Sequence, residues 1–208
     1  MAIEPGRRLP REQRRAQLLD VAAGTFGQDG YHNTSMDDIA EAAGVSKPVL
    51  YQHFPSKHSL YLALVEAACI ELAKTIDAAL DSPTNRDRVR ATIDGFYDFV
   101  TDGGPYFRFV FESDLAADPD VRALHWRTQV EIGSAIGAVI ASETDLDDQE
   151  STLLGISLVG MAQTSARRWR AQHDAGEVSL SAERARELTT ILCWRGVAAF
   201  PRTGSESD

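Results

Sequence analysis

TSMDDIAEAAGVSKPVLYQHFPSK, residues 34–57, has the pattern of two short helices joined by a glycine turn. Thr34 or Ser35 can cap the first helix, and Gly44 supplies the left-handed conformation that ends it. Ser46 can cap the second helix, with Pro48 in its first turn. One face of the first helix is apolar at helical spacing, through Met36, Ile39, Ala40 and Ala43. The stretch therefore predicts a helix-turn-helix.

The second of these helices has polar groups on the side that its apolar residues leave free. Leu50 and Phe54 lie four residues apart and can face inward. The outward positions are then Lys47, Val49, Tyr51, Gln52 and His53. Such groups can bond phosphates or base edges in a DNA groove. A small solvated helix in any helical domain fits the same spacing, so periodicity leaves both interpretations open.

A family resemblance favours the DNA-binding interpretation. GVSKPVLYQHFPSKHSLYLAL, preceded by YHNTSMDDIAEAA, resembles the DNA-binding signature of TetR-family transcriptional regulators. Tyr51, His53, Phe54 and Lys57 match the residues that recur in that signature, and the resemblance covers roughly residues 10–65. It implies DNA contacts from Arg14, Thr34, Ser35, Met36, Ser46, Lys47, Pro48, Val49, Tyr51, Gln52, His53 and Lys57.

The charge of the chain is divided unevenly along its length. The 208 residues carry a net charge of −10, which is unusual for a DNA-binding protein. Residues 1–57 hold seven basic and seven acidic residues, so the remaining 14 basic and 24 acidic residues account for the whole −10. This split favours a neutral head that is presented to DNA by an acidic body.

Composition excludes several other classes of protein. A hydrophobic fraction of 43% is ample for a core, and no apolar run is long enough to suggest a membrane span. Cys69 and Cys193 lie in apolar helical patterns without metal-ligand spacing, which indicates buried structural residues. We expect a cytoplasmic protein without a cofactor, metal site or membrane partner, whose basic residues 1–9 form an arm.

The remaining sequence reads as further helices. After a first helix from residue 10, we expect helices near residues 57–80, 85–102, 118–142, 148–173 and 180–200. PYFRFVFESDL alternates like a strand, but no second strand exists to pair with it, so a short helix is predicted. The fold class is all-α, with a three-helix DNA-binding head at residues 1–57 and a body of roughly six helices at residues 58–208.

The body is predicted to dimerise and to bind an effector. The last two long helices have more apolar surface than one body needs, which favours a homodimer reading a palindromic operator. A dense group of aromatic residues can line an apolar cavity for a small hydrophobic effector. The candidate lining residues are Leu64, Phe96, Phe99, Phe107, Phe111, Trp126, Met161 and Ser165.

A narrower resemblance concerns the effector. RLPREQRRAQLL, FRFVFESDLAADPDV and SLVGMAQTSARRW are similar to segments of actinobacterial TetR-family regulators of fatty-acid synthesis that sense long-chain acyl-CoA. That resemblance implies an apolar tunnel, with Arg167, Arg168 and Arg170 available to the phosphates. We expect a repressor of this type. The alternatives are a drug-efflux regulator that responds to a hydrophobic drug and a helical interaction module without DNA binding.

An enzyme is not expected. The five histidines occur in no metalloprotease motif, and Ser157 lacks the glycine spacing of a nucleophile elbow. No catalytic residue is predicted.

Overall fold

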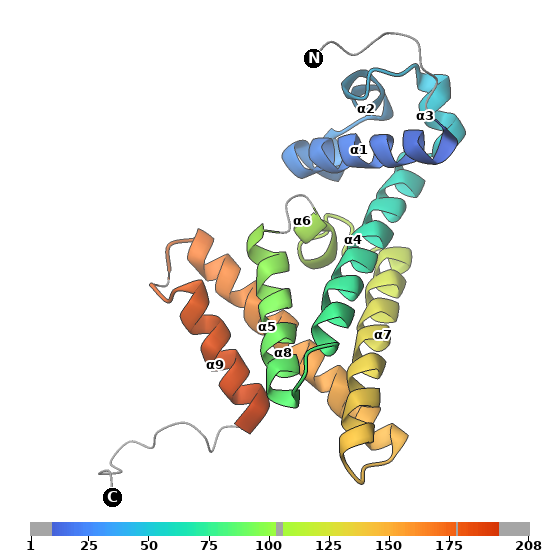
Figure 1. The fold of residues 1–208 in the computed structure, drawn as a ribbon. Coiled ribbons are helices and arrows are strands. Elements are labelled where there is room, and N and C mark those ends of the chain that lie inside the picture. The colour runs from blue at the N-terminus through green and yellow to red at the C-terminus, as the bar shows by residue number, and fades with distance from the viewer. Residues whose placement is uncertain (1–9, 103–105, 178, 196–208) are drawn as a thin grey trace, which may run out of the picture. The chain divides into compact units, whose positions relative to one another are not determined.

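The computed structural model describes residues 10–102, 106–177 and 179–195, and every regular element in these ranges is a helix (Figure 1). The helices are α1 (Arg11–Asn33), α2 (Met36–Ala42), α3 (Lys47–His53), α4 (Lys57–Leu80), α5 (Asn85–Asp102), α6 (Tyr106–Phe111), α7 (Pro119–Glu143), α8 (Asp148–Asp174) and α9 (Ala182–Arg195). The predicted all-α class is confirmed. The expected basic arm at residues 1–9 and the end of the last expected helix, at 196–200, lie outside the described residues.

The chain forms two compact units. The head unit comprises Met1–Ala68 and Pro105–Arg122, and the body unit comprises Cys69–Gly104 and Ala123–Asp208. Helices α4 and α7 each contribute residues to both units. The expected boundary at residue 57 differs from this division into packed units, and it stays a prediction.

The head unit is built around the predicted helix-turn-helix. Ser35 caps α2, because its hydroxyl accepts from the backbone N–H of Asp38 while the Asp38 carboxylate accepts from that of Ser35. Gly44 adopts φ 64° in the turn, as its left-handed role requires. Leu50 and Phe54 are fully buried, so their predicted inward orientation is confirmed.

The end of α1 is anchored by α6 and by the segment that follows it. Gly30 has φ 78° and breaks the regular geometry of α1 near its end. The Tyr31 N–H beyond this break donates to Asp114 Oδ2 at 2.8 Å. Arg108 of α6 donates to the Gly27 carbonyl at 2.5 Å. These charge-assisted bonds occupy backbone groups that the helix break leaves without intrahelical partners.

The aromatic segment that alternates like a strand is helix α6, as predicted. Phe107 and Phe109 are buried, and the Phe109 ring meets the ring of Tyr61 edge-on at 5.3 Å between centroids. The Tyr61 hydroxyl lies 3.0 Å from the hydroxyl of Ser113 and accepts from the Asp114 N–H. Burial and polar contacts thus hold α6 against α4 inside the head unit.

The body unit is organised around α5 and α8. Helix α5 packs against both α8 and α9 (Figure 1). The Tyr97 hydroxyl lies 3.1 Å from that of Thr189, and Trp169 Nε1 donates to the Leu180 carbonyl at 2.9 Å. Both aromatic side chains are buried, so each polar end needs and finds a partner.

Helices α7 and α8 cross with their backbones in contact. A Cβ atom added to Gly155 of α8 would lie 2.0 Å from the carbonyl oxygen of Gly133 and 2.8 Å from the N atom of Gly137, both on α7. No side chain fits at such a distance. The absence of a side chain at Gly155 is therefore what lets the two helices approach this closely.

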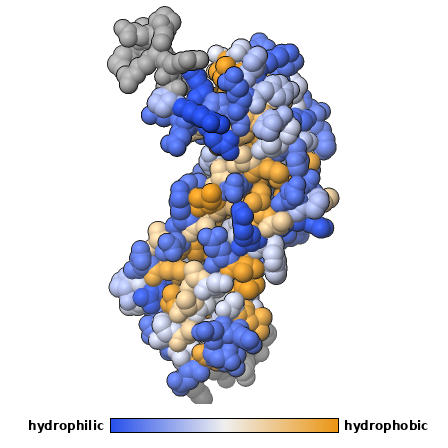
Figure 2. Space-filling model, turned by 90° about the vertical axis from the view of Figure 1, so that its right-hand side faces the viewer, coloured by the Kyte–Doolittle hydropathy of each residue, from blue (hydrophilic) through white to orange (hydrophobic). Residues whose placement is uncertain are grey.

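The surface mixes hydrophilic and apolar side chains on the face that Figure 2 shows. Over the described ranges, no helix combines the length and apolarity needed to cross a membrane.

The glycine crossing gives a stability test. Gly155→Ala places a methyl group against the α7 backbone, so we expect destabilisation by about 1–3 kcal/mol or more. Gly24→Ala is the control, because a Cβ there meets no atom within 4 Å. Alanine in that helix interior should stabilise by roughly 0.5–1 kcal/mol. Urea denaturation measures both, and equal free energies of unfolding for Gly155→Ala and the unsubstituted chain would contradict the packing argument.

Candidate functional site

Helix α3 presents a polar face that its own packing keeps outward. Leu50 is completely buried, whereas the Tyr51 side chain on the next position is 47% exposed. Lys47, Pro48 and Gln52 are also exposed. The buried side fixes this short helix in place, and its amide, phenol and ammonium groups point outward. Such groups can reach phosphates and base edges.

Lys47 is held by an acidic residue of α2. Its Nζ lies 2.5 Å from Asp37 Oδ2, and both side chains are more than half exposed. The hydrogen bond to Asp37, followed by the charge of that carboxylate, raises the pKa of Lys47. Exposed pairs of this kind contribute little to stability, so an approaching phosphate can compete for the ammonium group.

Arginines of α1 gather at the C-terminal end of α3. Arg15 donates to the His53 carbonyl at 3.3 Å, and its guanidinium carbon lies 4.3 Å from the centroid of the Phe54 ring. The pKa of His53 is lowered by partial burial and then by the positive charges of Arg11, Arg15 and Arg14. Of these arginines, only Arg14 was among the expected DNA contacts. The sequence could not show that Arg15 lies beside His53, because the two residues are 38 positions apart in the chain.

Lys57 faces the interior of the head unit. Its Nζ donates to the carbonyls of Tyr31 and Thr34 at 2.8 and 2.9 Å and lies 4.3 Å from the Tyr31 ring centroid. These contacts tie the first turn of α4 to the junction of α1 and α2. The expected DNA role of Lys57 stays a prediction beside this structural one.

The other expected DNA contacts differ in exposure. Thr34 and Met36 are buried, and the Thr34 hydroxyl donates to the Gly30 carbonyl at 2.8 Å. Ser35 and Ser46 are exposed, while Arg14 and Val49 are half-buried. The side chains that can reach a ligand therefore start at the N-termini of α2 and α3 and continue along α3.

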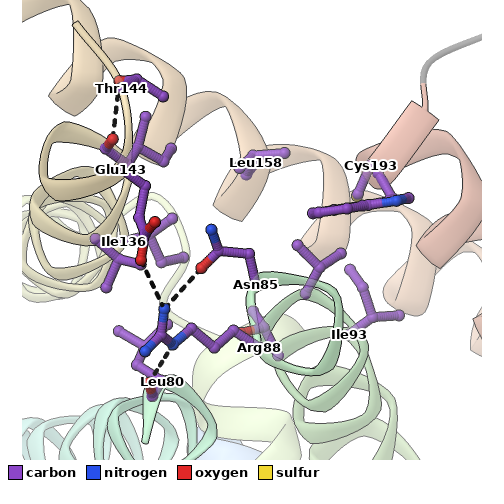
Figure 3. Close-up of a pocket in the computed structure, with 14 residues that line it drawn as sticks. Leu80, Asn85, Arg88, Ile93, Ile136, Glu143, Thr144, Leu158 and Cys193 are labelled. Atoms are coloured by element: carbon purple, nitrogen blue, oxygen red, sulfur yellow. Dashed lines mark hydrogen bonds and ion pairs between the residues drawn. The ribbon is translucent and has the colours of Figure 1, made fainter. Parts of the chain in front are cut away.

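The body unit contains an apolar pocket of about 280 Å³ (Figure 3). Helices α4, α5, α7, α8 and α9 and the loop that follows α7 supply its wall. The lining residues are Leu80, Asn85, Arg88, Val89, Thr92, Ile93, Ile136, Val139, Ile140, Glu143, Thr144, Leu158, Cys193 and Trp194. Burial raises the pKa of the Cys193 thiol to about 11, so this group is neutral at pH 7.

None of the eight residues expected to line a ligand cavity lines this pocket. Leu64, Phe107 and Phe111 belong to the head unit, and the other five belong to the body unit. Phe96 and Phe99 are buried, whereas the Trp126 side chain is 62% exposed. Met161 and Ser165 are half-buried. The pocket was missed because its aliphatic residues read as ordinary core positions in each helix.

Within the described ranges, one group of side chains has the composition of a metal site. His58, Asp118 and Asp120 offer ligand atoms within 4.8 Å of one another. However, Asp118 Oδ1 accepts from the backbone N–H of Asp120 and Val121, and Oδ2 lies 3.0 Å from His58 Nε2. A helix N-terminus is also unfavourable for a cation. Helix capping and the hydrogen bond between His58 and Asp118 account for the group, and we assign no metal.

Comparisons with known proteins agree on one family. The family model described as "Bacterial regulatory proteins, tetR family" matches residues 18–64. The chain is 36% identical to the "HTH-type transcriptional activator FasR" of Mycolicibacterium smegmatis, over 96% of this chain and 90% of that protein. A TetR-like regulator structure from Rhodococcus sp. RHA1 is 29% identical with TM-score 0.68, covering 92% of this chain and 99% of that one. A tetR-family structure from Streptomyces coelicolor is 26% identical with TM-score 0.64, covering 92% and 82%.

The two lysines of the head give a test of their different environments. Lys57→Ala removes two hydrogen bonds from a charged donor, so we expect a loss of about 2 kcal/mol or more in unfolding free energy. Lys47→Ala removes an exposed pair and should change stability by less than about 1 kcal/mol. Thermal and urea denaturation measure both. A stable Lys57→Ala variant would show that its contacts with Tyr31 and Thr34 do not hold the head together.

Proposed function

Because the chain belongs to the TetR family of bacterial transcriptional regulators, we propose that it binds a palindromic DNA operator as a homodimer and responds to a small apolar effector. The observation that carries the proposal is the outward polar face of α3, whose opposite side is fully buried. Family members are regulators rather than enzymes, in agreement with the absence of a catalytic prediction.

The head unit supports a division of labour in DNA recognition. Tyr51 and Gln52 on the exposed face of α3 can meet base edges or phosphates. Lys47 and the arginines at the start of α1 provide positive charge at the two ends of α3. Contacts to phosphates fix the register on the duplex, and contacts to bases provide sequence preference.

Exposed apolar side chains on α8 support dimerisation. The Leu153 and Leu154 side chains are 66% and 44% exposed in the single chain. Adjacent large apolar residues on the surface of a long helix are typical of a buried interface. A two-fold dimer through this part of the body unit would pair two recognition helices with two half-sites.

The pocket of the body unit supports effector binding. Its volume lies just below the usual range for small-molecule sites, and its wall is largely aliphatic. Helices α4 and α7 each contribute to both units, so a rearrangement of either helix in the body reaches the head. In one arrangement of the dimer, the spacing of the two recognition helices does not match successive major grooves. An effector that binds this arrangement more tightly than the DNA-binding one lowers operator affinity, typically by about 1–3 kcal/mol.

The effector class that we propose is a long-chain acyl-CoA, on the basis of the narrower resemblance, and a hydrophobic drug is the alternative.

The sign of regulation needs its own measurement. We expect a repressor, whereas the M. smegmatis relative is named as an activator. A reporter gene behind the operator assigns it directly, through lower or higher expression when the regulator is present.

Operator binding and effector response can be tested together. We expect a gel shift with the DNA upstream of the chain's own gene, reversed by acyl-CoAs in a manner that depends on chain length. Tyr51→Ala should abolish the shift and leave the melting temperature nearly unchanged. Val139→Trp fills the pocket and should retain the shift while losing the effector response. No shift at low salt would remove the regulator proposal, and an unchanged response of Val139→Trp would remove the pocket from it.

The dimer has a separate test with a matched control. Leu153→Glu/Leu154→Glu places charge on the α8 surface and should yield a monomer at micromolar concentration. Ile70→Glu is the control, because Ile70 is an exposed apolar residue on α4 outside the proposed interface. Light scattering measures the mass. A monomeric unsubstituted chain, or a dimer that withstands the α8 changes, would contradict the interface.

A further inference from the structure

Lys47 supplies the positive charge of α3. The seven residues of this helix include no other lysine or arginine. The pKa of His53 is lowered by partial burial and then by the neighbouring arginines, so its imidazole adds little charge at pH 7. Lys47 and Tyr51 lie four residues apart, and both are exposed on one face of the helix. The cation that α3 itself can offer to a DNA phosphate is therefore Lys47.

Asp37 of α2 holds this ammonium group in the free protein. Helix α2 packs against α3 (Figure 1). Lys47 Nζ donates to Asp37 Oδ2 at 2.5 Å. The two side chains are 61% and 57% exposed, so the pair is open to solvent and to a ligand that approaches α3.

The neighbouring carboxylate, Asp38, has a structural role that differs from that of Asp37. Asp38 forms the reciprocal cap of α2 with Ser35, through hydrogen bonds of 2.8 and 3.1 Å. The contact of Asp37 with Lys47 is an exposed ion pair, and such pairs add little to stability because solvent and salt screen them. Loss of the Asp37 carboxylate should therefore leave the head unit folded.

Asp37 and a DNA phosphate compete for the same group. A carboxylate and a phosphate both bind an ammonium group through a charge-assisted hydrogen bond to an anionic oxygen. While Lys47 is paired with Asp37, the two side chains together bring no net charge to the DNA. They then release no counterions from it. A phosphate that binds Lys47 must first replace Asp37.

We infer that Asp37 sets the affinity for DNA by competing with a backbone phosphate for Lys47. The inference rests on the proposed function and adds Asp37 to the residues that govern it. In the free protein, the Asp37 carboxylate takes the place of a phosphate oxygen on Lys47. Binding exchanges one anion for the other, so the complex gains only the difference between the two contacts.

The test is a double-mutant cycle on the full chain, with the DNA upstream of its own gene as the probe. Fluorescence anisotropy gives the dissociation constant at several salt concentrations. Asp37→Asn releases Lys47 and should tighten binding at low salt by about two- to fivefold for each protomer, the factor that an exposed pair is worth. In the proposed dimer the two factors multiply to roughly fourfold or more.

The salt dependence gives a second readout of the same variant. Each released lysine then neutralises a phosphate with its full charge. The slope of log affinity against log salt concentration should therefore steepen by about 0.9 for each protomer. A stabilised fold alone would not change this slope.

Three control variants separate the pair from the general effect of charge. Lys47→Gln closes the cycle, and in that background Asp37→Asn should tighten binding no more than Glu41→Gln does. Glu41→Gln removes the same charge from α2, and across the residues that the structure describes no ion pair within 4.0 Å involves Glu41. It should change the dissociation constant by less than about twofold, because salt screens a charge that is not in contact. Asp37→Ser repeats the main comparison with a second neutral residue.

The outcomes separate the inference from the proposed function. Equal tightening by Asp37→Asn and Glu41→Gln would overturn the competition. So would tightening by Asp37→Asn that persists in the Lys47→Gln background. No tightening by Asp37→Asn or Asp37→Ser, at an unchanged melting temperature, would show that Lys47 is not exchanged between the two anions. In these cases the unsubstituted chain still binds the DNA, so only the role of Asp37 is lost. If the unsubstituted chain does not bind, the proposed function is rejected and the inference with it.

Discussion

The head unit depends on one ammonium group placed between backbone carbonyls. Lys57 bonds the carbonyls of Tyr31 and Thr34, where α1 ends and α2 begins, and it does so from the first turn of α4. Carbonyls at a helix end lack intrahelical donors, so a charged donor there is worth more than a surface pair. The helix-turn-helix is thereby joined to the helix that leads into the body.

The local features of the fold were predictable because they depend on neighbours in sequence. Ser35 and Asp38 form a reciprocal cap within one turn, and Gly44 takes the positive φ that its position requires. Leu50 and Phe54 are buried as their spacing predicts. Helix α6 followed from the lack of any strand partner. In each case the deciding interaction spans a few residues, or the decision rests on the all-helical pattern of the chain.

The sites were harder to predict because they join distant parts of the chain. Lys57 matches the lysine of the family signature, but that match does not show that its ammonium group bonds two backbone carbonyls. The pocket draws Leu80, Ile136 and Cys193 from three helices, and each of them fits a core stripe equally well. Aromatic density along α5 and α6 predicts a cavity, and this stays a prediction; Phe96 and Phe107 are buried residues that lie in different units. Side-chain composition alone cannot distinguish a filled core from a hollow one.

The contact between α7 and α8 limits how the body can respond to a bound molecule. With Gly155 against the backbone of Gly133, the two helices have no side-chain layer between them along which to slide. We therefore expect α7 and α8 to move together at this crossing. Side chains do separate α5 from α8 and α9, and such layers permit small shear movements. For the proposed effector, we therefore expect any adjustment of the pocket to occur in α5 and α9, and α5 is the helix that directly follows α4.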